Sequence, residues 1–441
     1  MNGRTRPRPR RLAVLVGAAL LLSACSAGSL GSSSDSGGGE TLDFLIGNDE
    51  SAVALGEALV EAFNATNQGV TVTLETRPGG SEGDNVVKTR LATGDMADVF
   101  QYNSGSLFQA LTPQQQLTPL TGEGWVSTLQ DDFRSSVSAG GEVYGAPWGA
   151  SLGGGVLYNK PVYERLGLSV PTTWAEFMAN SAAIKAAGID PVVQTYGETW
   201  TSQLLVLADF HNVAAAEPGF AEQYTAGRVK YATSAPAIKG FQHLQEVHEA
   251  GYQNVDFASA ELEDGLRKVA TGEGAQYPML TSTVIQMVAN NPESAQDVGF
   301  FALPGDDAAT NGATQWLPAG IYVPQTTTGA KLEAAKTFLN WVTGPDGCEV
   351  ARTAVPPTGP FATAGCELPA DVPAAVADFA GYVDDGRTSP ALEFLSPVKG
   401  PALEQITVEV GSGIRSAQDG AALYDDDVRK QAQQLGLPGW D

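Results

Sequence analysis

The chain has 441 residues, of which 43% are hydrophobic and 17% charged, and its 25 basic and 50 acidic residues give a net charge of −25. This composition is typical of a soluble globular protein and excludes a largely disordered or membrane-embedded chain. The length exceeds what one hydrophobic core usually accommodates, so two domains are expected. A surface this acidic repels phosphate backbones, and we therefore expect no nucleic acid among the partners.

Residues 1–24 have the features of a secretory signal peptide. An arginine-rich start precedes an apolar run at residues 12–22, which is too short to span a bilayer comfortably. The run ends in Leu-Ser-Ala followed by Cys25, which resembles the lipobox of bacterial lipoproteins. That resemblance implies cleavage before Cys25, lipidation of its thiol and a lipid anchor on the outer face of the cytoplasmic membrane. Arg10-Arg11 leaves both the general secretory and the twin-arginine export routes open.

Residues 25–40 are rich in glycine and serine, which predicts a flexible tether. With Cys25 lipidated, Cys348 and Cys366 remain as an even pair in an oxidising compartment. A bond between them would close a loop of about 18 residues. The alternative, a metal or redox site, would need closer spacing and neighbouring histidines. We therefore expect a Cys348–Cys366 disulfide, no metal site and no cofactor.

Strand and helix patterns alternate from residue 41 onward, which predicts an α/β protein with a mainly parallel sheet in its first part. Thr173 and Glu176 have the spacing of a capping box, and Gly188 suits the end of the helix that they begin. Strands are expected at residues 41–46, 70–74, 97–102, 191–195, 298–304 and 321–324. Helices are expected near residues 53–63, 84–92, 173–187, 201–209, 238–250 and 331–343, and in the tail from residue 371.

The stretch at residues 145–160, GAPWGASLGGGVLYNK, combines a turn, an aromatic ring at Trp148 and an apolar strand pattern. Between them, Gly153-Gly154-Gly155 fits either a hinge or a close approach of the backbone to its neighbours, because glycine has no Cβ. We expect two lobes to meet at this stretch.

Signatures of catalysis are weak. Residues 79–83 match the G-x-S-x-G pattern around Ser81, but no apolar strand leads directly into them. The chain has three histidines, and His243 and His248, five residues apart, do not share a helix face as a metal pair would. We expect both to be surface residues. Nothing in the sequence assembles a nucleophile with a base, so we expect no enzyme.

Tryptophans near breaks between elements suggest a binding site instead. Trp174 and Trp341 lie in helix patterns and are expected in the core, whereas Trp148, Trp200 and Trp316 flank loops, where binding residues collect. Flat aromatic faces surrounded by amides and carboxylates suit a sugar, which has C–H groups on its faces and hydroxyls at its edge.

Several motifs in a fixed order carry a family resemblance. They are the lipobox, Tyr-Gly-Ala-Pro at 144–147, Leu-Tyr-Asn-Lys at 157–160, Pro-Thr-Thr-Trp at 171–174 and the strand at 298–304. Together they resemble family 1 extracellular solute-binding proteins, the carbohydrate-binding lipoproteins of ABC importers similar to maltose-binding protein. The resemblance covers essentially the whole chain, although Gln-Tyr-Pro-Met at 276–279 departs from the family pattern.

This resemblance implies an α/β, two-lobe fold of the type II periplasmic-binding-protein class, with a ligand cleft between lobes that crossover hinges join. Lobe 1 is expected at residues 41–148 plus 296–345, and lobe 2 at residues 149–295 plus 346–441. Ligand contacts of the family fall at strand ends, at the crossover and in two later loops. The corresponding residues here are Asn48, Asp49, Glu50, Tyr102, Asn103, Ser104, Trp148, Ser151, Trp200, Met279, Thr281, Trp316 and Gly320.

The function implied is that of a monomeric, lipid-anchored receptor that binds a mono- to oligosaccharide and delivers it to an ABC transporter permease. Replacing Trp148 by alanine is then expected to weaken sugar binding while leaving the fold intact. One alternative is a binding protein for a polyol, an osmolyte or an amino-sugar derivative, which clustering of Trp148, Trp200 and Tyr102 around one point would favour. Another is a secreted hydrolase that uses Ser81 or a carboxylate pair.

Overall fold

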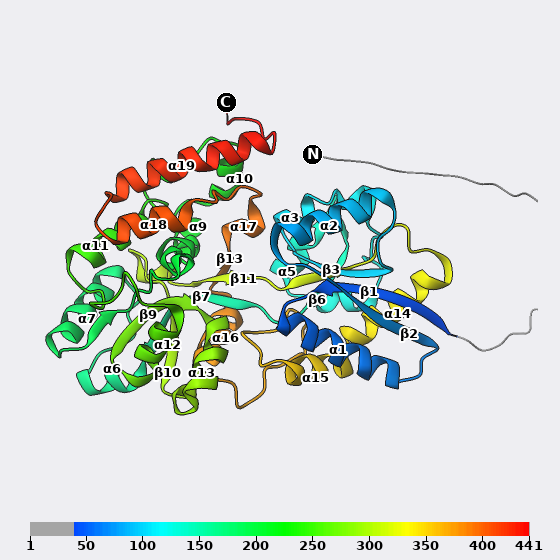
Figure 1. Cartoon of the computed structure of the whole chain (residues 1–441), viewed down its shortest axis with the longest axis horizontal. Helices are drawn as coiled ribbons and strands as arrows, with labels where there is room; N and C mark the ends of the chain where they lie inside the picture. Colours follow the sequence, from blue (N-terminus) through cyan, green and yellow to red (C-terminus); the bar gives the residue numbers. More distant parts are fainter. Residues whose placement is uncertain (1–38, 441) are drawn as a thin grey trace, which may run out of the picture. The chain divides into compact units, whose positions relative to one another are not determined.

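The computed structural model describes residues 39–440, which build two large β-sheets, each covered by helices (Figure 1). The signal peptide, Cys25 and almost all of the expected tether lie outside these residues. Among the helices of the described part, none combines the length and apolar character needed to cross a bilayer.

The first sheet has the strand order β2-β1-β3-β12-β6 and forms the first lobe. Strands β1, β2 and β3 pair in parallel, whereas β12 runs antiparallel to both β3 and β6. Helix α1 follows β1 directly because the Asp49 carboxylate caps it, accepting the Ala52 N–H at 2.9 Å. The elements of the first lobe are β1 (Glu40–Gly47), α1 (Glu50–Ala65), β2 (Val70–Arg77), α2 (Gly80–Thr93), β3 (Val99–Tyr102), α3 (Ser106–Gln109), α4 (Pro113–Gln116), a 3-10 helix (Gly124–Thr128), α5 (Asp131–Ser136), β4 (Ser138–Ala139), β5 (Glu142–Val143), β6 (Gly145–Trp148), β12 (Ala319–Tyr322), α14 (Gly329–Val342) and α15 (Pro345–Ala354).

The second sheet has the order β13-β11-β7-β9-β8, with β10 also paired to β7, and forms the second lobe. Strand β7, which enters directly from the first lobe after β6, is antiparallel to its partners β9, β10 and β11. The elements of this lobe are β7 (Leu152–Asn159), α6 (Lys160–Leu166), α7 (Trp174–Ala186), β8 (Asp190–Val192), a 3-10 helix (Thr199–Gln203), α8 (Leu204–Leu207), α9 (Phe210–Ala216), α10 (Phe220–Thr225), α11 (Lys239–Glu249), α12 (Leu262–Thr271), β9 (Gly274–Leu280), a 3-10 helix (Thr281–Thr283), α13 (Val284–Asn290), a 3-10 helix (Pro292–Ala295), β10 (Val298–Ala302), a 3-10 helix (Ala308–Thr310), β11 (Ala313–Trp316), α16 (Ala374–Asp384), β13 (Thr388–Pro390), α17 (Leu392–Leu395), α18 (Leu403–Gly411) and α19 (Ala417–Gln434).

The sheet membership of β10 and β11 differs from the expected division, which placed residues 296–345 in lobe 1. Both strands pair with β7 in the second sheet, and the chain returns to the first sheet only at β12. Helix α15 was expected almost entirely in lobe 2, but it packs on α1 and α14 of the first lobe. These positions follow from backbone pairing between distant strands, which the local pattern of each strand does not encode.

The glycines of β7 serve close packing. Gly153, Gly154 and Gly155 are buried in a regular strand, and their φ angles lie outside the left-handed region. A Cβ on Gly154 would lie 2.4 Å from the Trp316 ring, and one on Gly155 would lie 2.4 Å from the carbonyl oxygen of Phe301. The structure therefore supports the close-approach interpretation of this run.

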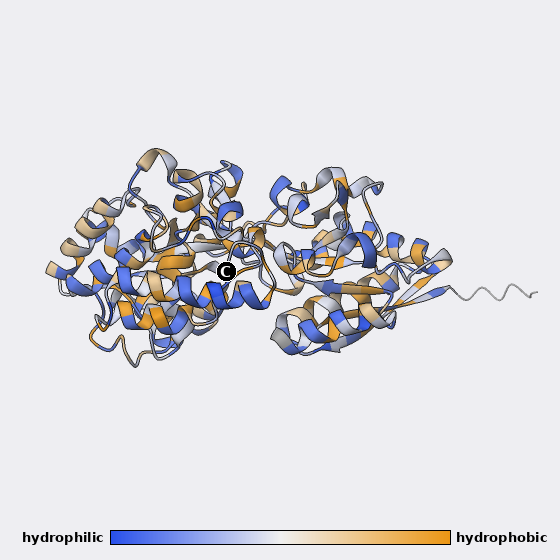
Figure 2. Ribbon diagram, turned by 90° about the horizontal axis from the view of Figure 1, so that it is seen from above, coloured by the Kyte–Doolittle hydropathy of each residue, from blue (hydrophilic) through white to orange (hydrophobic). Residues whose placement is uncertain are grey.

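Each lobe has its own apolar core. Figure 2 shows apolar segments gathered on the strands and inner helix faces, with hydrophilic faces outside. Trp174 and Trp341 are 6% and 8% exposed, as expected of core residues. The capping box at Thr173 and Glu176 is confirmed, as is the Cys348–Cys366 disulfide, whose Cα atoms lie 5.6 Å apart.

Candidate functional site

A cavity of about 300 Å³ lies where the two lobes meet. Two of the segments that cross between the lobes also line it, namely residues 149–151 and the segment after α15, residues 355–366. The first lobe contributes the start of α1, the end of β3 and the end of β6, while the second contributes the 3-10 helix at 281–283 and the start of α13. The segment after α15 closes the cavity as it leads back to the second lobe. The lining residues are Asp49, Ser51, Ala52, Leu55, Gln101, Trp148, Gly149, Ala150, Ser282, Ile285, Ala351, Val355, Pro356, Pro357, Thr358 and Phe361.

The backbone at the end of β6 sets the position of Trp148. Gly149 has a φ of 77°, a left-handed conformation that glycine adopts readily, and it turns the chain out of the strand directly after the tryptophan. The Trp148 ring packs edge-on against Phe44, with ring centroids 5.5 Å apart, and only 8% of the residue is exposed. One part of the indole therefore belongs to the first core and another part lines the cavity.

Hydrogen bonds join the crossing segments behind the cavity. The Ser151 hydroxyl and N–H both donate to the Pro360 carbonyl, at 2.8 and 2.9 Å. The Thr358 hydroxyl donates to the Ser151 carbonyl at 2.9 Å, and the Thr281 hydroxyl donates to the Thr358 carbonyl at 2.7 Å. Ser104 makes a similar link to residues 317–318, which lead from β11 of the second lobe back to β12 of the first: its hydroxyl donates to the Pro318 carbonyl at 2.8 Å.

Two of the candidates expected from the sequence line this cavity, namely Asp49 and Trp148. Asn48 and Glu50 flank Asp49 and are exposed, but they are not among the lining residues. Asn103 is exposed as well, and its carbonyl accepts the Tyr322 hydroxyl at 3.1 Å.

Five other candidates are buried in the lobes or at their junction. Ser104, Ser151 and Thr281 are 3%, 1% and 0% exposed, and their hydroxyls are engaged in the links described above. Met279 is fully buried in an apolar cluster of the second lobe. Gly320 lies inside the first sheet, paired with residues of β3 and β6. None of the five lines the cavity.

The remaining aromatic candidates point elsewhere. Tyr102 is 0% exposed beneath the Arg77 guanidinium, whose carbon lies 5.7 Å from the ring centroid, and burial together with the Asp84 carboxylate raises the pKa of its hydroxyl. The Trp200 indole donates to Glu198 at 3.1 Å, and that of Trp316 donates to Glu393 at 2.8 Å. Since Trp148, Trp200 and Tyr102 do not share the cavity, the cluster that would favour a cation cage is not formed there.

Most of the residues that line the cavity were not predicted from the sequence. In two cases the lining residue is the direct neighbour of a predicted one. Gln101, half-buried and bound through its side-chain oxygen to Arg77 at 3.3 Å, lines the cavity where Tyr102 was expected. Its polar side chain within an otherwise apolar strand was a usable signal, because alternate residues of a strand face opposite sides. Ser282 likewise takes the place of Thr281. Phe361 follows a proline- and glycine-rich segment and carries no such signal.

A larger cavity, of about 520 Å³, lies within the first lobe between the 3-10 helix at 124–128 and the α14–α15 turn. The 300 Å³ cavity is the better candidate site. Of the two cavities, it is the one that is lined from both lobes, and its wall includes a carboxylate, an amide, hydroxyls and two aromatic rings.

No histidine lines the cavity, and Asp49 is the one carboxylate among its lining residues. Within residues 39–440 no three His, Cys, Asp or Glu side chains come close enough to hold a metal ion. Strand β2 ends in the polar residues Glu-Thr-Arg at 75–77, before the G-x-S-x-G residues at the start of α2, and the three histidines lie on α9 and α11 of the second lobe. His243 is not a surface residue: it is 2% exposed and stacks on Trp174 at 3.7 Å.

The described fold and sequence match a known family and its solved structures. The family model described as bacterial extracellular solute-binding protein matches residues 48–347. The multiple sugar-binding protein of Streptococcus mutans serotype c is 25% identical over 291 residues, which cover 65% of this chain and 67% of that protein.

Among solved structures, the apo form of RafE from Streptococcus pneumoniae is similar with a TM-score of 0.73 at 19% identity, covering 90% of this chain and 98% of that one. The binding protein MsmE from Bacillus subtilis, in an open conformation, has a TM-score of 0.74 at 18% identity, covering 90% and 99%. These likenesses show the two-lobe type II fold of periplasmic solute-binding proteins, and the family match shows that this chain belongs to the bacterial extracellular solute-binding proteins.

Proposed function

We propose that this chain is an extracellular receptor that binds a mono- to oligosaccharide in the cavity between its lobes and delivers it to the permease of an ABC transporter. The observation that carries the proposal is the composition of the cavity wall. Trp148 and Phe361 supply aromatic faces, while Asp49, Gln101 and Ser282 supply acceptors and donors for hydroxyl groups.

The size of the cavity is compatible with this ligand class. Ligand pockets in proteins usually have volumes of about 300–1,000 Å³, and the cavity here, at about 300 Å³, lies at the lower end. It would hold about one or two sugar rings, so a longer oligosaccharide would extend from it toward solvent. Asp49 is the one carboxylate in the lining, and this favours a neutral, hydroxyl-rich ligand over an anionic one.

Related structures support the same ligand class. RafE has been solved in complex with raffinose, and a protein from Bacillus licheniformis in complex with stachyose. Another similar structure is described as a chitin oligosaccharide binding protein. In each of these three cases the named ligand is an oligosaccharide, which supports a saccharide as the ligand class of this chain.

We further propose that Cys25 is the lipid attachment site and that the receptor acts as a monomer. Its first lobe comprises residues 40–148 with 319–354, and its second lobe comprises residues 152–316 with 367–440. Labelling with radioactive palmitate, compared between the natural chain and Cys25→Ser, tests the anchor. Retention of the label by the variant would contradict it.

The binding proposal is tested by isothermal titration calorimetry and thermal shift with galactose, melibiose, raffinose, stachyose, maltotriose and chitotriose, with inositol and glycine betaine as non-sugar probes. We expect at least one saccharide to bind and to raise the melting temperature, because a ligand that binds only the folded state stabilises it. Binding of a non-sugar probe with no response to any saccharide would overturn the assignment to carbohydrate.

A further inference from the structure

The segment enclosed by the disulfide forms one wall of the candidate ligand cavity. Cys348 and Cys366 are 18 residues apart in sequence, and the chain between them leaves α15 and runs along the cavity. The residues of this segment that line the cavity are Ala351, Val355, Pro356, Pro357, Thr358 and Phe361. They include one of the two aromatic rings in the wall.

Both ends of the segment are attached to the first lobe. Helix α15 packs against α1 and α14 at one end. At the other end, Gln130 donates its N–H to the Ala362 carbonyl at 2.9 Å, and Ala364 donates to the Thr128 carbonyl at 2.7 Å. Between these attachments, the segment accepts hydrogen bonds from Ser151, which lies between β6 and β7, and from Thr281, in the 3-10 helix that follows β9 in the second lobe.

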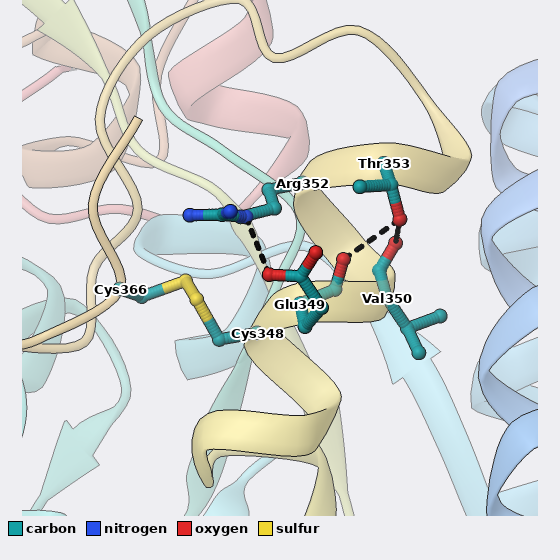
Figure 3. Close-up of a disulfide and its surroundings, with 6 residues drawn as sticks. All are labelled: Cys348, Glu349, Val350, Arg352, Thr353 and Cys366. Carbon is teal, nitrogen blue, oxygen red and sulfur yellow. Dashed lines mark hydrogen bonds and ion pairs between the residues drawn. A yellow bond between two sulfur atoms is a disulfide. The ribbon is translucent and has the colours of Figure 1, made fainter. Parts of the chain in front are cut away.

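The disulfide lies directly behind the aromatic wall. A void of about 30 Å³ is lined by both cysteines together with Trp148 and Phe361, so a single gap separates the sulfur bridge from the two rings. Figure 3 shows the bridge running from α15 to the loop at Cys366, beside the 2.7 Å ion pair of Glu349 and Arg352.

The other side of the bridge faces the larger groove of about 520 Å³, which both cysteines also line. Both residues are half-buried, so the bridge contacts the cavity wall on one side and is open to small reagents on the other. A dithiol entering the groove can attack one sulfur, and a second exchange then leaves two protein thiols and a cyclic disulfide of the reagent.

We propose that Cys348 and Cys366 are positioning residues for the ligand cavity: their disulfide holds residues 355–361, and with them Phe361, in the arrangement that binds saccharide. This inference rests on the proposed function. Without the bridge, α15 and the loop at residue 366 are joined only by the intervening chain and non-covalent contacts, and the wall is present for a smaller fraction of the time. Apparent affinity falls in proportion to that fraction, so a wall formed one-tenth of the time raises Kd about tenfold.

Two measurements on the full chain test the inference. The first is hydrogen–deuterium exchange of Cys348→Ser/Cys366→Ser without ligand, with Val428→Ala as the control. Val428 is fully buried in α19 of the second lobe, so its truncation destabilises the protein away from the cavity. We expect the peptides containing Gln130, Ser151 and Ala364 to exchange at least tenfold faster in the double-serine variant than in the control. Equal exchange in both would overturn the inference.

The second measurement is calorimetric titration with raffinose, and with each other saccharide of the panel that binds the natural chain. We expect Kd to rise about tenfold in the double-serine variant and in the natural chain reduced by dithiothreitol, and to stay within twofold in Val428→Ala. Phe361→Ala should weaken binding, whereas Phe361→Tyr, which keeps the ring, should restore most of it. An unchanged Kd in a folded double-serine variant would refute the positioning role.

Failure of the proposed saccharide-binding function and failure of the positioning role of the disulfide give different results. If no saccharide binds even the natural oxidised chain, the proposed function fails, and the exchange measurement still decides whether the bridge holds the segment. If saccharide binds the natural and double-serine proteins equally, the function stands and the positioning role fails.

Discussion

Replacement of Trp148 by alanine is expected to affect both stability and binding, because the structure places the indole in the first core as well as in the cavity wall. The residue is only 8% exposed and packs against Phe44 at 5.5 Å. Truncation of a buried tryptophan to alanine lowers the free energy of unfolding by about 3–5 kcal/mol. The expectation from the sequence, that the fold would be left intact, therefore changes to a folded but clearly destabilised variant.

The loss of binding is a separate quantity. At 8% exposure the indole offers a sugar roughly 20 Å², and with an equal area on the sugar about 40 Å² of apolar surface leaves water, which corresponds to about 1 kcal/mol. That free energy corresponds to an increase in Kd of about fivefold. Calorimetric titration with raffinose, or with another panel sugar that binds the natural chain, measures it, and urea unfolding followed by circular dichroism measures the stability.

Trp341→Ala is the matched control. Trp341 is also 8% exposed and also packs edge-on against a phenylalanine, Phe63, at 5.5 Å, but it does not line the candidate cavity. The two variants should lose similar stability, and only Trp148→Ala should lose affinity. If both weaken sugar binding equally, or if neither does, Trp148 is a core residue alone and the proposed site is wrong.

Three further predictions concern stability. Removing the disulfide in Cys348→Ser/Cys366→Ser should lower the free energy of unfolding by about 3 kcal/mol, measured by denaturant titration, because the bridge closes a loop of moderate length; an unchanged transition midpoint would contradict this. Burial raises the pKa of the Asp209 carboxyl to about 8. The folded state therefore keeps a proton that the unfolded chain releases near pH 4. The free energy of unfolding consequently falls as the pH rises between these two values, by up to about 1.4 kcal/mol per pH unit. Asp209→Asn should remove this part of the pH dependence in melting curves recorded from pH 5 to 8, and parallel curves for both proteins would refute the assignment. Gly155→Ala should destabilise the second lobe by more than 1 kcal/mol, since its Cβ would meet the Phe301 carbonyl oxygen at 2.4 Å, and a melting temperature equal to that of the natural chain would show that the strand shifts freely.

Local features were predictable because neighbouring residues determine them. The capping box at Thr173 follows from a spacing of three residues, and the alternation of strands and helices follows from hydrophobic periodicity. The pairing of Cys348 with Cys366 followed from counting, since no other cysteine was expected to remain free. The order of motifs identified the family, which the match over residues 48–347 shows.

The candidate cavity depends on contacts that no local pattern encodes. Phe361 reaches the wall because residues 355–361 bond to Ser151, more than 200 positions earlier in the chain. Gln101 and Ser282 replace the expected neighbours because strand alternation and the turn after β9 decide which side chain faces inward.

Composition, periodicity and motif order thus determined the α/β class, the two-lobe family and the disulfide of this chain, because each depends on residues close in sequence or on their order. The membership of β10 and β11 in the second sheet and the wall of the cavity were decided by tertiary structure alone. Strand register and the crossing segments bring together residues hundreds of positions apart, and their arrangement depends on the free energy of the whole packed molecule.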